Sequence, residues 1–230
     1  MSEHDGGASA IDVVFLDVGG VIYDDTVYRR ALLRALRDLG ASVGDDAFDR
    51  EYERCRDLQG GSFRRRLAAA FLSDGTVDER TEALRRRASG YWSYTPGALE
   101  ADVLPALGIL KRRYRLGIIA NQPSDVRAAL QRDGIDAFLD VWGISDDLGL
   151  EKPDPELYAQ ALRLAGVEPG RAVMVGDRLD YDVRPARAEG MRAVWVLRGE
   201  APRRPTAEQL GEADASIHSL SELPAVLESL

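Results

Sequence analysis

The chain has 230 residues, of which 45% are hydrophobic and 30% are charged, and its formal net charge is −9. This length allows one large domain or a core that carries a smaller inserted unit. The negative charge argues against sequence-independent nucleic-acid binding, which requires a basic face. No stretch approaches the roughly 18 apolar residues of a membrane-spanning helix, and no secretion signal opens the chain. With a single cysteine, Cys55, these features predict a cytoplasmic protein without a disulfide framework.

The first predicted element is an apolar strand over residues 13–17, which ends at Asp17 and runs into the turn Val18-Gly19-Gly20. A carboxylate at the end of a buried strand needs a cation, a lysine or a reaction to account for it. The next stretch, residues 23–94, shows helical patterns and no strand. We expect these helices to pack on one another as a bundle.

From residue 99 onward, predicted helices and strands alternate. The strands are expected at residues 116–120, 138–142, 172–175 and 193–197. The helices are expected near 99–113 and 124–133, from 155 onward, and near 181–189 and 220–229. Ser124 is expected to cap the second of these helices, and Asp154-Pro155 to open the third. Short buried strands that alternate with helices predict a parallel sheet. The expected fold class is therefore α/β, with a Rossmann-like core and an inserted all-helical unit.

Four polar residues fall where this sheet would bind a ligand. Asp17, Asn121 and Asp177 each lie at the carboxyl end of a predicted strand, and Lys152 lies in a loop after another. Ligands of open parallel sheets bind at that edge. Carboxylates gathered there repel one another unless positive charge is near. Lys152 supplies part of that charge, and a divalent cation would supply the rest; Mg²⁺ suits one or two carboxylates with water and a phosphate oxygen.

These residues belong to motifs with a known order. Asp17 follows its strand, Asn121 follows the next, and then come Glu151-Lys152-Pro153-Asp154-Pro155 and Gly176-Asp177-Arg178-Leu179-Asp180-Tyr181-Asp182. In this combination, from residue 11 to 225, the chain resembles the haloacid dehalogenase superfamily of hydrolases. The resemblance implies a core domain of residues 1–22 and 95–230. It also implies a C1-type helical cap domain, residues 23–94, that closes over the site.

The resemblance also implies a mechanism. Asp17 would be the nucleophile and form an aspartyl-phosphate, while Lys152 would neutralise the nucleophile and the phosphoryl oxygens. The implied ligands of Mg²⁺ are oxygen donors: the Asp17 carboxylate, the backbone carbonyl of Gly19, Asp177, and Asp182 directly or through water. The implied phosphate contacts are Asn121, Gly20 and Lys152.

Two positions depart from the family pattern. Phosphatases of this group carry an aspartate two residues after the nucleophile, as general acid and base, and this chain has Gly19. Such help contributes about 10²–10⁴ in rate. Asp24 and Asp25 lie nearby in sequence and are expected to be solvated linker acids. Ala120 replaces the expected phosphate-binding Ser or Thr. If only the acid is missing, Gly19→Asp should raise turnover on poor leaving groups.

Two other clusters have simpler expected roles. The arginine runs at residues 64–66 and 85–87 are interpreted as solvated helix faces paired with local acids. The aromatic residues Tyr91, Trp92 and Tyr94 are interpreted as packing at the junction between cap and core.

The leading hypothesis is a Mg²⁺-dependent phosphatase, a phosphomonoesterase for a small phosphorylated metabolite. One alternative is a 2-haloacid dehalogenase, which uses the same aspartate on carbon. A second is a catalytically weak protein of the same fold that binds a phosphorylated ligand for regulation, an alternative that Gly19 and Ala120 keep open. No nucleic-acid or membrane partner is expected. The sequence allows a homodimer without fixing the oligomeric state, and it does not name the substrate.

Overall fold

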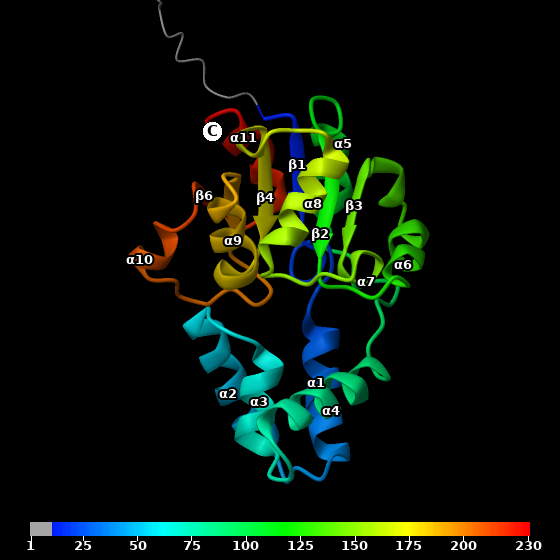
Figure 1. Ribbon diagram of the computed structural model, residues 1–230, viewed down its shortest axis with the longest axis vertical. Helices are drawn as coiled ribbons and strands as arrows, with labels where there is room; N and C mark the ends of the chain where they lie inside the picture. The colour runs from blue at the N-terminus through cyan, green and yellow to red at the C-terminus, as the bar shows by residue number, and fades with distance from the viewer. Residues whose placement is uncertain (1–10) are drawn as a thin grey trace, which may run out of the picture.

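The computed structural model describes residues 11–230, which form an α/β layer and a group of four helices at one edge of it (Figure 1). All strand pairs of the sheet are parallel, in the order β3-β2-β1-β4-β5-β6. The strands are β1 (Val13–Leu16), β2 (Arg115–Ala120), β3 (Val141–Ile144), β4 (Ala172–Gly176), β5 (Arg192–Val196) and β6 (Ala215–Ile217). The predicted α/β class with a Rossmann-like parallel sheet is confirmed.

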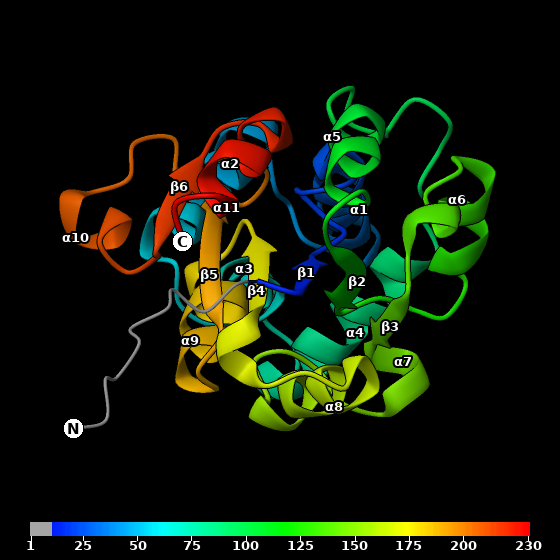
Figure 2. The same ribbon diagram turned by 90° about the horizontal axis from the view of Figure 1, so that it is seen from above.

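Helices cover both faces of the sheet because β1 is apolar on both sides. Val14 and Leu16 belong to one apolar cluster, whereas Val13 and Phe15 belong to another, as the two-residue period of a strand requires. One face carries α5 (Val103–Leu110), α6 (Val126–Arg132) and α11 (Leu223–Leu227), and the other α8 (Pro155–Ala165) and α9 (Arg184–Ala188) (Figure 2). Full burial of one apolar side chain such as those of β1 stabilises the fold by about 1.5–3 kcal/mol.

The four remaining long helices form a separate group, here called the helical unit. They are α1 (Thr26–Asp38), α2 (Asp45–Leu58), α3 (Phe63–Phe71) and α4 (Val77–Ser89). Their apolar faces build a core of their own that contains Leu32, Leu36, Phe48, Leu67 and Leu84. Figure 1 places the helical unit beyond the carboxyl ends of the strands. It therefore faces the edge where the sequence predicts a site.

Two strands differ from the prediction. β3 begins at Val141, because residues 136–138 form a 3-10 turn and the Asp140 carboxylate accepts a hydrogen bond from the backbone N–H of Leu116 at 2.9 Å. The predicted strand began too early because residues 138 and 139 are as apolar as the strand itself. β6 was not predicted, since three residues at the sheet edge are too few to show a period.

The shorter elements complete the chain, and one of them corrects a predicted helix cap. They are α7 (Ser145–Leu148), α10 (Ala207–Leu210), a π-helical turn (Leu179–Val183) and three 3-10 turns (Asp136–Phe138, Pro169–Arg171 and Leu220–Glu222). Ser124 does not cap α6, because its hydroxyl donates to Asp146 at 2.8 Å and Asp147 at 2.6 Å instead. Asp154 does cap α8, as predicted. No helix within residues 11–230 has the length and apolar character needed to cross a bilayer.

Candidate active site

Three carboxylates and one lysine meet at the carboxyl edge of the sheet. Asp17 follows β1, Asp177 follows β4, and Asp182 lies on the π-helical turn. Each of the three offers an oxygen, and these oxygens lie within 4.8 Å of one another. The Nζ atom of Lys152, from the loop before α8, lies 2.8 Å from Asp17 and 2.6 Å from Asp182. Three segments that are distant in sequence therefore build one charged centre.

Glycines make this close approach of carboxylates feasible. Gly20 adopts a φ of 68°, and a Cβ atom at this position would overlap the Asp177 carboxylate. A side chain at Gly176 would overlap Asp182 in the same way. The N–H of Gly20 donates to the carbonyl of Tyr23 at 2.8 Å, so in this conformation it is not directed at a ligand. What Gly20 contributes here is room for Asp177.

Within residues 11–230, one carboxylate of the charged centre, that of Asp177, has no positively charged partner. Burial alone would lower the pKa of Lys152, but Asp17 and Asp182 outweigh it and raise that pKa above its ordinary value. Burial raises the pKa of Asp182 to about 6, and burial also raises the pKa of Asp177, with further effects of Asp25 and Asp182. Asp177 is 2% exposed, and within the described chain no Lys or Arg forms an ion pair with it. The oxygen donors and this surplus negative charge fit a hard divalent cation.

Asn121 is placed close to the charged centre, where its amide positions Lys152. Its Nδ2 donates to the carbonyl of Lys152 at 2.9 Å, and its Oδ1 accepts from the N–H of Lys152 at 2.7 Å. The adjacent Gln122, which sequence reasoning missed, donates to the hydroxyl of Tyr94 at 2.9 Å, and its buried Oε1 has no partner in the described chain. Ser145, directly after β3 at the start of α7, also lines the cavity and was missed as well. Its place at a strand end is the signal that could have identified it.

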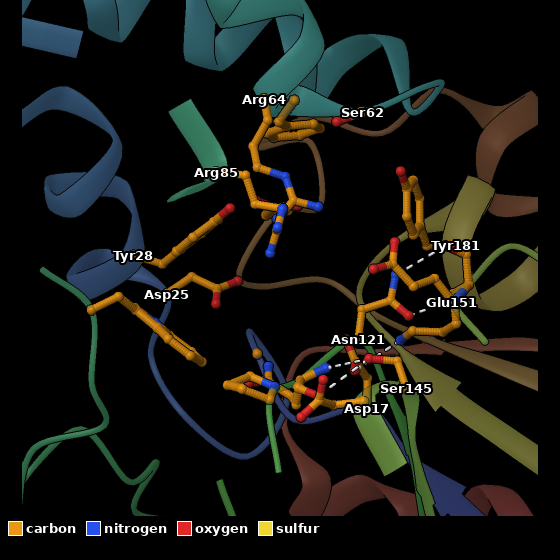
Figure 3. Close-up of a pocket in the computed structure, with 18 of the residues that line it drawn as sticks. Asp17, Asp25, Tyr28, Ser62, Arg64, Arg85, Asn121, Ser145, Glu151 and Tyr181 are labelled. Atoms are coloured by element: carbon orange, nitrogen blue, oxygen red, sulfur yellow. Dashed lines mark hydrogen bonds and ion pairs between the residues drawn. The ribbon is translucent and has the colours of Figure 1, made fainter. Parts of the chain in front are cut away.

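A cavity of about 690 Å³ separates this centre from the helical unit. Figure 3 shows Arg64 and Arg85 reaching into it from the helical unit, with Tyr28 beside them and Asp17 on the opposite side. Arg64 forms no ion pair with a carboxylate of residues 11–230, whereas Arg85 contacts Glu82 at 2.7 Å. The interpretation of the arginine runs as solvated faces paired with local acids is therefore wrong for Arg64. It fits Arg85, which is exposed and pairs with Glu82 although it also lines the cavity.

Neighbouring arginines in the two runs also fit the interpretation as solvated helix faces paired with local acids. Arg65 pairs with Asp78, and Arg87 pairs with Asp38. Trp92 and Tyr94 pack on each other with ring centroids 4.7 Å apart, as expected of the aromatic cluster. Both rings also line the cavity.

Asp25 corrects a second expectation. Asp24 is exposed and its carboxylate accepts hydrogen bonds from Thr26, as a linker acid would. Asp25 instead points into the cavity (Figure 3), with Oδ1 2.8 Å from the position that a Cβ atom of Gly19 would occupy. Burial, with the charges of Glu200 and Asp17, raises the pKa of Asp25. The prediction failed because the fold of the turn before α1, which returns the chain to Gly19, is not visible in the sequence.

Comparisons with known proteins agree with this geometry. Residues 11–190 match the family model of the haloacid dehalogenase-like hydrolases. A phosphoserine phosphatase of Thermus thermophilus is 37% identical over 153 residues, which are 64% of this chain and 59% of that protein. The chain therefore matches a little over half the length of this curated relative.

Two solved structures are similar over nearly the whole chain. A 2-haloacid dehalogenase of Pseudomonas syringae pv. Tomato has a TM-score of 0.61 and 28% identity, covering 95% of this chain and 99% of that one. A phosphatase of the same superfamily from Thermococcus onnurineus has a TM-score of 0.60 and 27% identity, covering 94% and 98%. Because the family model spans well over half of the residues, the chain belongs to the haloacid dehalogenase-like hydrolases.

Proposed function

We propose that this hydrolase is a Mg²⁺-dependent phosphatase that acts on a small phosphorylated metabolite through an aspartyl-phosphate on Asp17. The observation that carries the proposal is the placement of Lys152 between Asp17 and Asp182, with Asp177 beside them and lacking a cation. Such a centre offers a nucleophile, a cation for the phosphoryl oxygens, and oxygen donors for a metal ion. Two of the similar proteins are named phosphatases.

The metal would be held by oxygen atoms at the carboxyl edge of the sheet. The proposed ligands are the carboxylates of Asp17 and Asp177, the backbone carbonyl of Gly19, and Asp182 through water. The direct contact of Asp182 with Lys152, at 2.6 Å, favours this indirect role. When bound, Mg²⁺ would neutralise these carboxylates and draw charge from the phosphoryl oxygens.

The protein's own residues perform the displacement. A carboxylate oxygen of Asp17 attacks phosphorus, and the bond to the leaving oxygen breaks. Lys152, which is 4% exposed and contacts Asp17, neutralises charge on the transferring phosphoryl group. Asn121 fixes the backbone of Lys152 through two hydrogen bonds, and we assign its remaining amide hydrogen to a phosphate oxygen. Because Gly20 has no side chain, both Asp177 and the phosphoryl group can lie against the glycine turn after β1.

Side chains of the helical unit favour an anionic substrate. We place it in a C1-type cap domain, residues 23–94, on a core of residues 1–22 and 95–230. Arg64 and Arg85 bring positive charge to the side of the cavity opposite Asp17, which favours a metabolite with a second anionic group besides its phosphate. A volume of about 690 Å³ suits a small molecule.

The dehalogenase remains the second candidate because one similar structure carries that name. It would use Asp17 to displace a halide from carbon, a reaction that requires no metal. Buried Asp177, without a cation of its own, is unexplained by that chemistry. A regulatory protein would keep the phosphate site without turnover, and Gly19 with Ala120 would account for this loss.

The cellular setting is part of the proposal. Cys55 is a free, buried thiol in the helical unit, which agrees with a reducing cytoplasm. The homodimer stays a prediction, to be checked by sedimentation of the purified chain.

The test is an assay of phosphate and halide release by the purified protein. A panel of phosphorylated metabolites and short 2-haloacids is supplied with Mg²⁺ or with EDTA, and wild type is compared with Asp17→Asn. We expect phosphate release that needs Mg²⁺ and is lost in the variant. Halide release without metal would establish the dehalogenase instead. Phosphate binding without turnover of any substrate would favour the regulatory protein.

A further inference from the structure

Position 19 lacks the carboxylate that the proposed reaction uses twice. A proton must reach the leaving oxygen in the first step, and another must leave the attacking water in the second. Gly19 has no side chain to do either. The space that such a side chain would enter is nevertheless not free. It contains the carboxylate of Asp25, whose Oδ1 lies 2.8 Å from the Cβ position of residue 19 and whose Oδ2 lies 2.8 Å from that of residue 20.

The fold of residues 18–25 brings Asp25 to this position. The N–H groups of Ile22 and Tyr23 both donate to the carbonyl of Val18, at 2.9 and 3.0 Å, and close a tight turn. Asp24 then pairs with Ala98 through its N–H, at 2.8 Å, which fixes the exit of the turn. The chain thereby returns beside Gly19 six residues later, at the start of α1.

The partly buried carboxylate of Asp25 has no structural partner among residues 11–230 that would explain its position. No hydrogen bond or ion pair of the described chain involves it, although Asp25 is the residue that precedes α1 and could cap it. The capping contact to Thr26 is made by Asp24 instead, at 2.9 Å. Removing a carboxylate from water without giving it a partner costs free energy, and the partly buried carboxylate of Asp25 is aimed into the cavity that contains Asp17.

We propose that Asp25 is the general acid and base of this enzyme, in place of the aspartate missing from position 19. This inference rests on the proposed phosphatase function. In the first step Asp17 forms its bond to phosphorus, the bond from phosphorus to the leaving oxygen breaks, and that oxygen takes the proton of Asp25. In the second step water attacks the phosphoryl group and Asp25 takes a proton from it. The Asp17–phosphorus bond then breaks, which releases inorganic phosphate and restores both aspartates.

Tyr94 is the competing group, since its hydroxyl lies 3.6 Å from the Cβ position of residue 19. That hydroxyl accepts a hydrogen bond from Gln122 at 2.9 Å, and burial raises the pKa of Tyr94 well above its ordinary value. A phenol of this kind is a poor base for water. Tyr94→Phe should therefore cost much less activity than Asp25→Asn.

The experiment compares Asp25→Asn with its neighbour Asp24→Asn, which alters an exposed capping carboxylate. With an alkyl phosphate, a poor leaving group, Asp25→Asn should lower kcat by about 10²–10⁴ while Asp24→Asn leaves it unchanged. With 4-nitrophenyl phosphate, which needs no acid, Asp25→Asn should release a burst of one nitrophenolate per site. Slow turnover should follow, because the water step still lacks its base.

A second pair of variants tests whether positions 19 and 25 share one function. Gly19→Asp alone would set two carboxylates against each other, so we expect no gain in turnover from it. The double variant Gly19→Asp/Asp25→Ala removes that clash and should turn over the alkyl phosphate at least about tenfold faster than Asp25→Ala. A structural role of Asp25 would produce no such rescue.

Two results would overturn the inference. One is an Asp25→Asn protein that retains wild-type kcat on the alkyl phosphate. The other is an equal loss on both substrates, without a burst and without rescue, accompanied by a higher Mg²⁺ requirement, which would make Asp25 a contributor to the metal site. Wild-type phosphate release is measured in the same assay. Its absence would refute the proposed function itself, whereas failure confined to the variants refutes only the role of Asp25.

Discussion

At the scale of single residues, one ion pair outside the site fixes the turn on which the site depends. Arg198 contacts both oxygens of Asp102, at 3.0 and 2.9 Å, and donates to the backbone carbonyls of Gly20 and Val21. Asp102 also accepts hydrogen bonds from the hydroxyl of Ser219 and from a backbone N–H, each at 2.7 Å. The glycine turn after β1 is thus held by a carboxylate at the start of α5.

Replacing this carboxylate should destabilise the protein in a pH-dependent way. Burial on its own would raise the pKa of Asp102, but hydrogen bonds from Ser219 and Arg198 outweigh it and lower the pKa below its ordinary value. A lowered folded-state pKa stabilises the fold above the unfolded pKa of about 4, and this contribution is lost as pH falls through the folded value. Asp102→Asn should cost about 1–3 kcal/mol at pH 7.

Urea unfolding at several pH values measures this effect, with exposed Asp74→Asn as the control. The difference between wild type and Asp102→Asn should shrink as pH is lowered below about 4. A difference that stays constant down to pH 2, or one that also appears for Asp74→Asn, would contradict the account.

Sequence reasoning identified the site residues that have a local signal, namely a strand end or a motif. It missed the position of Asp25, which depends on the fold of a turn. Asp17 and Asp177 were found because each ends a buried strand. Lys152 was found through its motif. Asp25 looked like an ordinary linker acid, because only the hydrogen bonds of residues 18–24 reveal that it returns to Gly19. The six-residue separation has no periodicity from which this contact could be inferred.

At the scale of elements, α3 divides its arginines between solvent and the cavity. Arg65 pairs with Asp78 on the outer face, whereas the neighbouring Arg64 lines the cavity. Polarity alone could not distinguish them, because the apolar face of a helix is visible in its sequence but the location of a ligand cavity is not. The four central strands, β1, β2, β4 and β5, were predicted well for the opposite reason, since their burial on both sides makes them continuously apolar.

The position of Arg64 predicts a specific kinetic defect. If it binds an anionic group away from the reacting phosphate, Arg64→Leu removes a contact that is equal in the ground and transition states. KM for a doubly anionic substrate should rise by about 10- to 100-fold, the equivalent of ~1.5–3 kcal/mol, and kcat should change little.

The matched control is Arg65→Leu, whose side chain faces solvent. 4-Nitrophenyl phosphate, which has no second anion, serves as the control substrate and should lose little affinity in either variant. An Arg64→Leu protein with unchanged KM for every doubly anionic substrate would show that this side chain does not select the substrate.

At the scale of the whole molecule, one buried amide links the helical unit to the sheet. Gln59, at the end of α2, is fully buried and donates to the carbonyl of Glu200 at 2.8 Å. Its Oε1 accepts from the N–H of Leu179 at 2.8 Å, and its own carbonyl accepts from Arg184 at 2.7 Å. Its φ of 43° is a left-handed conformation that few residues adopt. These contacts tie the end of α2 to the loops beside the sheet.

Gln59→Gly should weaken this attachment of the helical unit without straining the backbone, since glycine accepts a left-handed φ. The loss of a buried, bonded amide corresponds to about 2 kcal/mol. Hydrogen exchange at Leu179 should therefore accelerate by roughly 30-fold, while Gln160→Ala on exposed α8 surface serves as the control. Unchanged protection at Leu179 would show that other contacts suffice to hold the helical unit in place.

The central claim is that Asp17 carries the phosphoryl group between substrate and water, and its direct test is mass spectrometry of the enzyme quenched in acid during turnover. The account predicts that the peptide containing Asp17 gains the mass of one phosphoryl group, that Asp25→Asn increases the fraction modified, and that Asp17→Asn abolishes it. Steady phosphate release without any modification of Asp17, or full activity in Asp17→Asn, would contradict the account.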